Sequence, residues 1–516
     1  MTLVARLASA AVALLVAACA ALPPMPPDRV ASTALGDGRG SRLGRVTEPV
    51  LAAAPAGTSG FHGFAEPRDA FAARIVLAAT AERTIDAQYY IWRGDLAGTL
   101  LFEALWRAAE RGVRVRLLLD DANTGGLDPL LAALDAHPMI EVRLYNPFVQ
   151  RGVRALGFLT DFDRLNRRMH NKSFTADNVA TIVGGRNVAD EYFGAGDDVG
   201  FIDLDVLAVG PAVREVSAQF DRYWNSASAY PAAAFVGPSN ADGARDLEAR
   251  FAAARADAAA VGYLDALRRS SLVEDLQARR LALEWAVAHV IEDDPAKTLA
   301  AAERSDVLLF PELIRTMGRP ERTLDIVSAY FVPGDEGTAA LTEIARRGVR
   351  VRILTNSLAA NDVSVVHAGY LKRRRDLLGA GIALYELRPS AAPPAAADGH
   401  GGSTGSSGLH AKTYAVDDAR IFVGSFNFDP RSARLNTELG VVIESAAFAR
   451  RLAATFDSIV PLRAYEVRLA PDGDGLQWIE RSAAGEEKRY EDEPETSGFK
   501  RFGVRLLSIL PIEWLL

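Results

Sequence analysis

The sequence contains the same spaced set of reactive residues twice. The pattern is HxKx4D, and its members are His170, Lys172 and Asp177 in the first copy and His410, Lys412 and Asp417 in the second. Because the chain has only seven His and six Lys, two complete copies at matched positions are not expected by chance. The repeat therefore indicates two half-sites of one chemistry.

Histidine and lysine in this spacing suit chemistry on a phosphodiester. Residues two apart on a strand point to the same face, so each His projects beside its Lys. Histidine can act as nucleophile or as general acid and base, and lysine binds phosphate oxygens. With two facing sets, one His would attack phosphorus while the other protonates the leaving alcohol and then deprotonates the incoming one. Protonated Lys has no lone pair for a metal, so we expect neither a metal site nor a cofactor.

Polar residues follow each motif at equal spacing. Asn187 and Asn427 stand ten residues after the motif Asp, and both could donate hydrogen bonds to a phosphate. The residue eight after the Asp is Gly185 in the first copy but Ser425 in the second. We therefore expect one phosphate donor, the Ser425 hydroxyl, to come only from the second half.

The elements around the motifs are also duplicated. Each half has a strand-like run, a helical stretch, a second strand after Arg-Gly-Val-Arg-Val-Arg, and a third strand. The paired segments are 83–90 with 322–330, 100–109 with 338–345, 109–118 with 345–354, and 140–145 with 382–385. Such alternation predicts an α/β fold of two related lobes, each a mixed or parallel sheet covered by helices, with the site between them.

The remaining segments complete a division into six parts. We expect a signal peptide with a lipobox, a flexible Pro- and Gly-rich tether, a first lobe, a helical insert, a second lobe and a C-terminal extension with an apolar tail. Their predicted bounds are 1–19, 20–60, 61–228, 229–305, 306–465 and 466–516. Helix-forming residues without Pro over 245–260 and over 271–291 predict the helical insert.

The N-terminal residues are typical of a targeting segment. Arg6 precedes an apolar run over 7–22, which is short for a membrane-spanning helix and suits a signal peptide. The only Cys of the chain, Cys19, follows Val-Ala-Ala, as in a bacterial lipobox, so we predict its lipidation. The alternatives are a chance Cys in a signal peptide and a small buried thiol. A lipid anchor would place the body at a membrane facing the periplasm, and Ala20 favours the outer membrane by resemblance to enterobacterial sorting rules.

Composition excludes some classes of protein. The chain has 516 residues, 49% hydrophobic and 24% charged, which is a globular mixture large enough for about three domain-sized units. Its net charge of −8 argues against a protein that coats nucleic acid. One Cys excludes a disulfide framework and a Cys-cluster metal site.

The paired motifs with trailing Gly and Asn resemble those of the phospholipase D superfamily over roughly residues 60–516. Within it, the chain resembles the third class of bacterial cardiolipin synthases, which join two phospholipids by transphosphatidylation. The segments that carry this closer resemblance are 120–128, 163–174, 184–193, 361–370 and 510–516.

The resemblance implies a role for each site residue. His170 would become phosphatidylated and His410 would act as acid and base, although the near-symmetry leaves the reverse assignment open. Phosphate would be held by Lys172, Lys412, Asn187 and Asn427. Asp203 and Glu438 would orient the His rings, with Asp205 and Asp198 as alternatives. Asp177 and Asp417 are grouped with the catalytic residues as members of the motif, and they are expected to brace its turn. His367 either lines the substrate cleft or is an ordinary core residue.

The predicted function is phosphatidyl transfer through a phosphohistidine. Its expected partners are phosphatidylglycerol, phosphatidylethanolamine as a further candidate, the membrane surface and an accessory protein, but no nucleic acid. The alternatives are a phospholipase D hydrolase, a nuclease and a catalytically silent lipoprotein scaffold. The basic and apolar tail over 499–516 either packs on the body or contacts the membrane.

Overall fold

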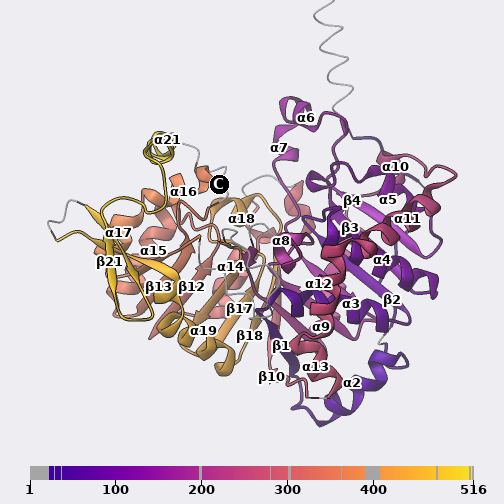
Figure 1. Ribbon diagram of the computed structural model, residues 1–516, viewed down its shortest axis with the longest axis horizontal. Helices are drawn as coiled ribbons and strands as arrows, with labels where there is room; N and C mark the ends of the chain where they lie inside the picture. The colour runs from indigo at the N-terminus through magenta and orange to yellow at the C-terminus, as the bar shows by residue number, and fades with distance from the viewer. Residues whose placement is uncertain are drawn as a thin grey trace, which may run out of the picture.

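Two large β-sheets, each covered by helices, form the two lobes of the molecule (Figure 1). The computed structural model describes residues 22–27, 29–36, 38–196, 200–278, 280–299, 304–361, 363–389, 407–471, 475–510 and 513. Within them, the first sheet has nine strands and the second has ten, and a third sheet has two short strands. The prediction of a two-lobed α/β fold is confirmed.

The first sheet has a parallel centre and antiparallel flanks. Its order is β10-β1-β8-β6-β5-β2-β3-β4-β9, with β2, β3 and β4 parallel. The strands are β1 (Ser59–Phe64), β2 (Thr84–Tyr89), β3 (Arg114–Asp120), β4 (Ile140–Tyr145), β5 (Ser173–Ala176), β6 (Ala180–Gly184), β8 (Asp205–Val209), β9 (Ala229–Pro231) and β10 (Glu284–Ala286).

Helices lie on both faces of this sheet. Leu117 and Leu119 of β3 pack in one hydrophobic cluster with α3 and α4, and the intervening Leu118 packs with α9 on the other face. Burial on both faces explains the continuous apolar run of β3. The helices of the first lobe are α2 (Arg42–Ala53), α3 (Pro67–Thr80), α4 (Leu96–Glu110), η1 (Asp121–Asn123), α5 (Asp128–Asp135), α6 (Arg154–Thr160), α7 (Phe162–Leu165), α8 (Asp190–Phe193) and α9 (Pro211–Trp224).

The second sheet repeats the plan of the first. Its order is β11-β18-β17-β16-β12-β13-β14-β19-β20-β21, again with a parallel centre, β12-β13-β14. The strands are β11 (Ala288–Glu292), β12 (Thr323–Ser328), β13 (Arg350–Asn356), β14 (Ala383–Leu387), β16 (Lys412–Val416), β17 (Arg420–Gly424), β18 (Leu439–Ile443), β19 (Ala464–Leu469), β20 (Leu476–Arg481) and β21 (Glu487–Tyr490). The helices are η2 (Pro295–Thr298), η3 (Ser305–Val307), α14 (Leu309–Met317), α15 (Gly334–Arg346), α16 (Ser364–Leu371), α17 (Arg374–Gly379), α18 (Pro430–Arg434), α19 (Ala446–Ser458), α20 (Val460–Arg463) and α21 (Gly498–Ile509).

The insert between the lobes is only partly helical. It forms α10 (Ala233–Val236), α11 (Gly243–Ala256), α12 (Ala258–Arg268) and α13 (Ser271–Gln277), but the chain then becomes β10 and β11. The helix expected over 271–291 is therefore wrong beyond Gln277. β10 pairs with β1 and β11 pairs with β18, so one short stretch completes an edge of each sheet. Unpaired sheet edges and the β-favouring Trp, Val and Ile residues of this stretch outweigh its helical propensity.

The expected tether is partly a folded element of the first lobe. Ala34 donates its backbone N–H to the Asp221 carboxylate at 2.9 and 3.0 Å, and Arg116 donates to the Ser32 carbonyl at 2.9 Å. Residues 42–53 then form α2. Asp221 and the buried Arg116 thus hold this segment on α9 and β3, so a flexible tether over the whole of 20–60 is wrong.

The second lobe extends beyond its predicted end. The expected boundary at residue 465 falls inside β19, and β19, β20 and β21 add three antiparallel strands to the second sheet. Beyond them, α21 packs on α16 through Val504, which clusters with Leu358 and Ala368. Much of the predicted C-terminal extension is therefore part of the lobe.

The two motif aspartates brace the sheets at a distance from the histidines. Asp177 and Asp417 follow β5 and β16 with left-handed backbone φ angles of 53° and 54°. The Asp177 carboxylate accepts the backbone N–H groups of residues 82, 83 and 84 at 2.8–3.2 Å, where β2 begins. Asp417 holds residues 321, 322 and 323 at the start of β12 in the same way. These contacts support the expected bracing of the turn, and the grouping of both Asp residues with the catalytic residues stays a prediction.

We expect Asp177→Ala to lower the stability of the fold more than it lowers catalytic turnover. It leaves three backbone N–H groups without their acceptor, which should reduce the free energy of unfolding by about 1–3 kcal/mol. Denaturant unfolding followed by circular dichroism measures this change. The exposed Asp242→Ala serves as control, and unchanged stability of Asp177→Ala would contradict the bracing role.

Candidate active site

Each motif histidine is held by a segment of the opposite lobe. The His170 backbone N–H donates to the Thr437 carbonyl at 2.8 Å, and Thr437 donates back to the Arg168 carbonyl at 2.9 Å. On the other side, β15 (Ser407–Leu409) pairs in parallel with β7 (Gly200–Ile202), and His410 donates to the Ile202 carbonyl at 2.8 Å. These two junctions bring both motifs to the interface of the lobes.

At these junctions, each motif histidine contacts a carboxylate that belongs to the opposite lobe. His170 Nδ1 lies 2.8 Å from Glu438 Oε2, and His410 Nδ1 lies 2.6 Å from Asp203 Oδ2. The structure thus places both predicted carboxylates on the His rings, each on the ring of the other lobe. Of the alternatives, Asp205 forms a buried ion pair with Arg74 at 2.8 Å, and Asp198 lies outside the described residues.

Two side chains at matching positions of the lobes each hold the residue that precedes a motif histidine. Asp120 ends β3 and accepts the Met169 backbone N–H at 2.8 Å. Asn356 ends β13 and accepts the Leu409 backbone N–H, also at 2.8 Å. Neither residue was among the predicted site residues, although both close the repeated Arg-Val-Arg strands, and this shared position was a usable signal.

Both motif lysines are buried beside their histidines. Lys172 immediately precedes β5, and Lys412 is the first residue of β16. Each lysine donates through Nζ to the backbone carbonyl of its own motif histidine, His170 or His410. Burial lowers the pKa of Lys172 well below its usual value, Glu438 and Asp203 counteract this, and Lys412 adds to the lowering. The charges of both lobes therefore act on one shared centre.

Burial and the lysines keep both histidines neutral. Burial lowers the pKa of His170, and repulsion from Lys172 and Lys412 lowers it further. Burial and Lys412 bring the pKa of His410 to about 3 despite the opposing attraction of Asp203. With Nδ1 of each ring facing a carboxylate, Nε2 is the nitrogen left for reaction.

The two carboxylates differ in their environment. Burial raises the pKa of Glu438 to about 7, although Lys172 and the Ser425 hydroxyl oppose the rise. Burial would also raise the pKa of Asp203, but attraction to His410 and Lys412 brings it below its ordinary value. The site is thus symmetric in its contacts but asymmetric in its charge.

The serine and glycine that differ between the motifs give the two carboxylates different neighbours. The Ser425 hydroxyl donates to Glu438 and accepts the Leu439 backbone N–H at 3.0 Å. A Cβ at Gly185 would lie 2.2 Å from Asp203 Oδ1, so the first lobe has no room for a side chain there. Because Ser425 holds Glu438, a contact with phosphate would require it to leave that partner, and its phosphate-binding role stays a prediction.

The two asparagines support the loops around the site. Asn187 Oδ1 accepts the Ile91 backbone N–H at 3.1 Å, and Asn427 Oδ1 accepts the Tyr330 backbone N–H at 3.4 Å. Asn187 also donates to the Tyr192 hydroxyl at 2.9 Å. Their phosphate-binding role stays a prediction.

Aromatic rings that the sequence analysis missed surround the histidines. The Tyr90 ring centroid lies 5.0 Å from that of His170, and the Tyr192 and Phe201 centroids lie 5.0 and 5.3 Å from that of His410. These rings pack directly on the two imidazoles. His367 is buried instead in the second lobe, with Nε2 3.0 Å from Glu493 Oε1, and is not one of the rings packed on the motif histidines.

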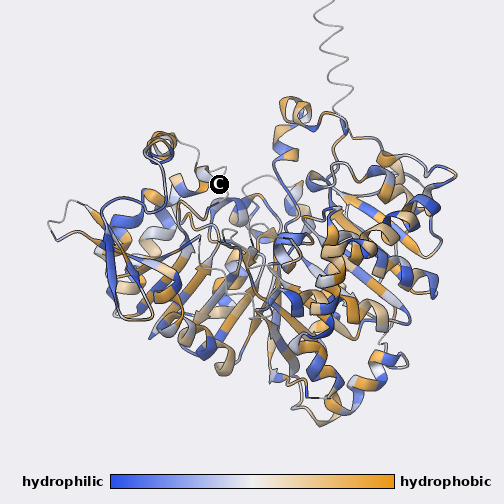
Figure 2. Ribbon diagram, in the orientation of Figure 1, coloured by the Kyte–Doolittle hydropathy of each residue, from blue (hydrophilic) through white to orange (hydrophobic). Residues whose placement is uncertain are grey.

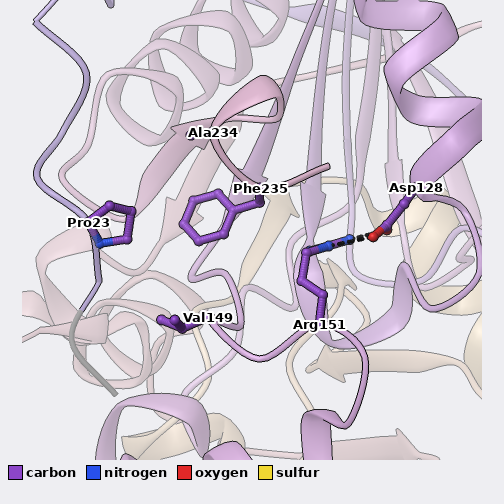
Figure 3. Close-up of a pocket in the computed structure, with 6 residues that line it drawn as sticks. All are labelled: Pro23, Asp128, Val149, Arg151, Ala234 and Phe235. Carbon is purple, nitrogen blue, oxygen red and sulfur yellow. Dashed lines mark hydrogen bonds and ion pairs between the residues drawn. The ribbon is translucent and has the colours of Figure 1, made fainter. Parts of the chain in front are cut away.

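We also considered a metal site and a surface pocket away from the two motifs. Among the described residues, no group of three or more His, Cys, Asp or Glu side chains is placed to hold a metal ion. A pocket of about 380 Å³ lies in the first lobe, where Arg151 pairs with Asp128 beside Pro23, Val149, Ala234 and Phe235 (Figure 3). It is separate from the His–Lys centre.

Comparison with known proteins identifies the family. The family model described as "Cardiolipin synthase, PLD-like domain" matches residues 75–224 and 313–460, which contain both motifs. The chain belongs to this family. It is therefore an enzyme of the phospholipase D superfamily, as the motifs predicted.

Individual members of the cardiolipin synthase family support this assignment. The chain is 49% identical to cardiolipin synthase C of Escherichia coli (strain K12) over 477 residues, covering 92% of this chain and 100% of the relative. It is 26% identical to the major cardiolipin synthase ClsA of Bacillus subtilis (strain 168), over 75% of this chain and 66% of the relative. The crystal structure of phosphatidylserine synthase from Haemophilus influenzae Rd KW20 shares the fold, with a TM-score of 0.55 at 14% identity over 92% of this chain and 100% of that chain.

We expect Asp203→Asn and Glu438→Gln each to reduce turnover by about 10²–10⁴-fold, because an amide misorients the imidazole that its carboxylate holds. Glu444→Gln is the matched control, since Glu444 pairs with the exposed His289 at 3.1 Å, away from the motifs. Turnover of product from phospholipid vesicles measures the effect. Retention of full turnover by both site variants would contradict the orienting role.

The lowered pKa of His410 predicts a pH-dependent stability. Below the ordinary pKa of about 6.5, the unfolded chain binds a proton at His410 that the folded chain binds only near pH 3. The wild type should therefore lose stability between pH 6.5 and pH 4, and His410→Asn should lose less, by at most about 1.4 kcal/mol per pH unit. Denaturant unfolding at several pH values tests this, and parallel pH curves for the two proteins would contradict it.

Proposed function

We propose that this protein is a cardiolipin synthase that transfers a phosphatidyl group to the glycerol hydroxyl of phosphatidylglycerol. One observation carries the proposal most directly, namely two His rings held by carboxylates of opposite lobes beside two buried lysines. Such a centre suits a double displacement at one phosphodiester. The 49% identity to a protein named cardiolipin synthase C supports the choice of substrate class, phospholipids.

The reaction proceeds in two displacements. His170 Nε2 attacks phosphorus of the donor lipid, the P–N bond forms, and the P–O bond to the head alcohol breaks while His410 gives that alcohol a proton. The acceptor hydroxyl then loses its proton to His410 and attacks phosphorus, which forms the new P–O bond and breaks the P–N bond. Lys172 and Lys412 balance the charge on the phosphate oxygens in both transition states.

Substrate binding supplies the condition for proton transfer. In the empty site, repulsion from both lysines helps to lower the pKa of each His. An anionic phosphodiester between the lysines offsets that repulsion, so the pKa of the histidines rises when substrate binds. The acid form of His410 is therefore stabilised only when there is an alcohol to protonate.

The placement of the enzyme follows from its substrate. We propose that it works at a membrane, held by a lipid on Cys19 and facing the periplasm, with the outer membrane favoured by Ala20. Within the described residues, no helix is long and apolar enough to span a bilayer. An accessory protein that presents the second lipid is a further partner under this proposal.

The direct test is a product assay. Vesicles of phosphatidylglycerol and phosphatidylethanolamine are incubated with the protein without divalent metal and analysed by mass spectrometry. We expect cardiolipin from the wild type and a loss of at least about 10³-fold for His170→Ala and for His410→Ala, because each removes one partner of the displacement. His289→Ala, which changes an exposed His, should keep full activity.

The products distinguish the alternatives. Phosphatidic acid without cardiolipin, whatever acceptor is offered, would show a hydrolase. Unchanged cardiolipin synthesis by both motif variants would contradict the two-histidine mechanism. Absence of any phospholipid product from the wild type, with and without other cell-envelope proteins, would refute the proposed activity.

A further inference from the structure

The C-terminal helix α21 carries a stripe of large apolar side chains that face away from the protein. Phe499 and Ile509 are 87% and 79% exposed, and Phe502 and Leu506 are also exposed. Positions 499, 502, 506 and 509 fall on one helical face because they are three or four residues apart. The opposite face is the one that packs on α16, through the buried Val504.

The first lobe has a corresponding protrusion. α6 packs inward through Gly157, where an added Cβ would lie 2.8 Å from Leu165, and exposes apolar side chains outward. Leu159 is 81% exposed, and Val153 and Leu156 are also exposed. This protrusion leads through α7 directly to the motif that contains His170.

The two protrusions point to the same side of the molecule. α21 on the second lobe and α6 on the first project past the same end of their sheets, on either side of the junction between the lobes (Figure 1). Both include hydrophobic residues on their ribbons (Figure 2). Exposed apolar stripes of this kind mark an interaction surface.

We propose that α6 and α21 form a two-point docking face for an anionic phospholipid bilayer, which turns the junction of the lobes toward the membrane. This inference rests on the proposed function, since it explains how a two-lobed site reaches lipid substrates. It names the elements that touch the membrane, which the activity alone does not.

Charge and geometry favour a bilayer over a protein partner. Arg505, whose side chain is 68% exposed, borders the apolar stripe of α21, as in helices that lie in an anionic interface, and it also lies 3.7 Å from Asp492. A flat surface contacts both protrusions at once, although they belong to different lobes. A single protein partner that covers one protrusion has no need of the other.

The start of the described chain lies at the same protrusion. Pro23 shares a pocket with Val149 and Arg151, which immediately precede α6 (Figure 3). The predicted lipid anchor Cys19 is four residues before Pro23, so the chain can separate them by at most about 14 Å. A lipid at Cys19 would therefore reach the same surface that α6 contacts.

Site-specific labels test the docking face. In a full-length Cys19→Ser chain, single Leu159→Cys, Phe502→Cys and Val46→Cys variants carry an environment-sensitive fluorophore. Val46 is the matched control, because it is an apolar side chain 68% exposed on α2, at the far end of the molecule (Figure 1). The probe is a phosphatidylglycerol and phosphatidylethanolamine vesicle that contains spin-labelled lipid.

Contact with lipid should quench two labels and spare the third. We expect quenching at positions 159 and 502 and none at 46. Absence of quenching at either 159 or 502 overturns the two-point face. A response of these labels that depends on protein concentration without vesicles also overturns it, because it shows that a second copy of the chain covers them. The labels report contact whether or not product forms, so failure of the catalytic proposal leaves this readout intact.

A paired activity measurement separates docking from chemistry. We expect Leu159→Asp/Phe502→Asp to reduce turnover of vesicle lipid about tenfold more than turnover of short-chain phospholipid below its micelle concentration, since only the former requires an interface. Val46→Asp should change neither. Equal losses on the two substrates would contradict the proposal.

Discussion

The exchange of carboxylates between the lobes is the interaction on which the site depends. Glu438 reaches across to His170 and Asp203 reaches across to His410, at 2.8 and 2.6 Å. Neither lobe alone can fix its own imidazole, since the orienting group belongs to the other. The backbone pairings beside them, between His170 and Thr437 and between His410 and Ile202, hold the two lobes at the separation that this exchange requires.

The cost of the centre is the burial of four cation-forming side chains in one place. Both lysines and both histidines are less than a tenth exposed, and burial disfavours their charged forms. The flanking carboxylates and the backbone carbonyls that accept from the lysines offset part of this cost. A phosphodiester anion bound between the lysines would stabilise their charged forms and so offset more of this cost.

Duplication gives this enzyme matched supports and room for asymmetry. Asp120 and Asn356 perform the same task at the ends of β3 and β13, and Asp177 and Asp417 do so at the starts of β2 and β12. By contrast, Ser425 donates to Glu438, whereas Gly185 leaves Asp203 without such a donor. One change of residue thus gives the two carboxylates different environments within a nearly symmetric frame.

The sequence by itself determined the chemistry and the plan of the fold. Two HxKx4D motifs name the reacting groups, and repeated strand and helix patterns predict two α/β lobes, because both signals are local and survive in residue types and spacing. The resemblance to the phospholipase D superfamily, together with matching positions in the two halves, pointed to Asp203 and Glu438 as partners of the rings.

Only the tertiary structure decided which residues meet. The partners of the two rings are 268 and 207 residues away along the chain, and no periodicity encodes such contacts. The same holds for β10 and β11, whose mixed local propensity is decided by the open edges of the two sheets that they join. Packing alone places Tyr90 and Tyr192 on the motif histidines and His367 against Glu493.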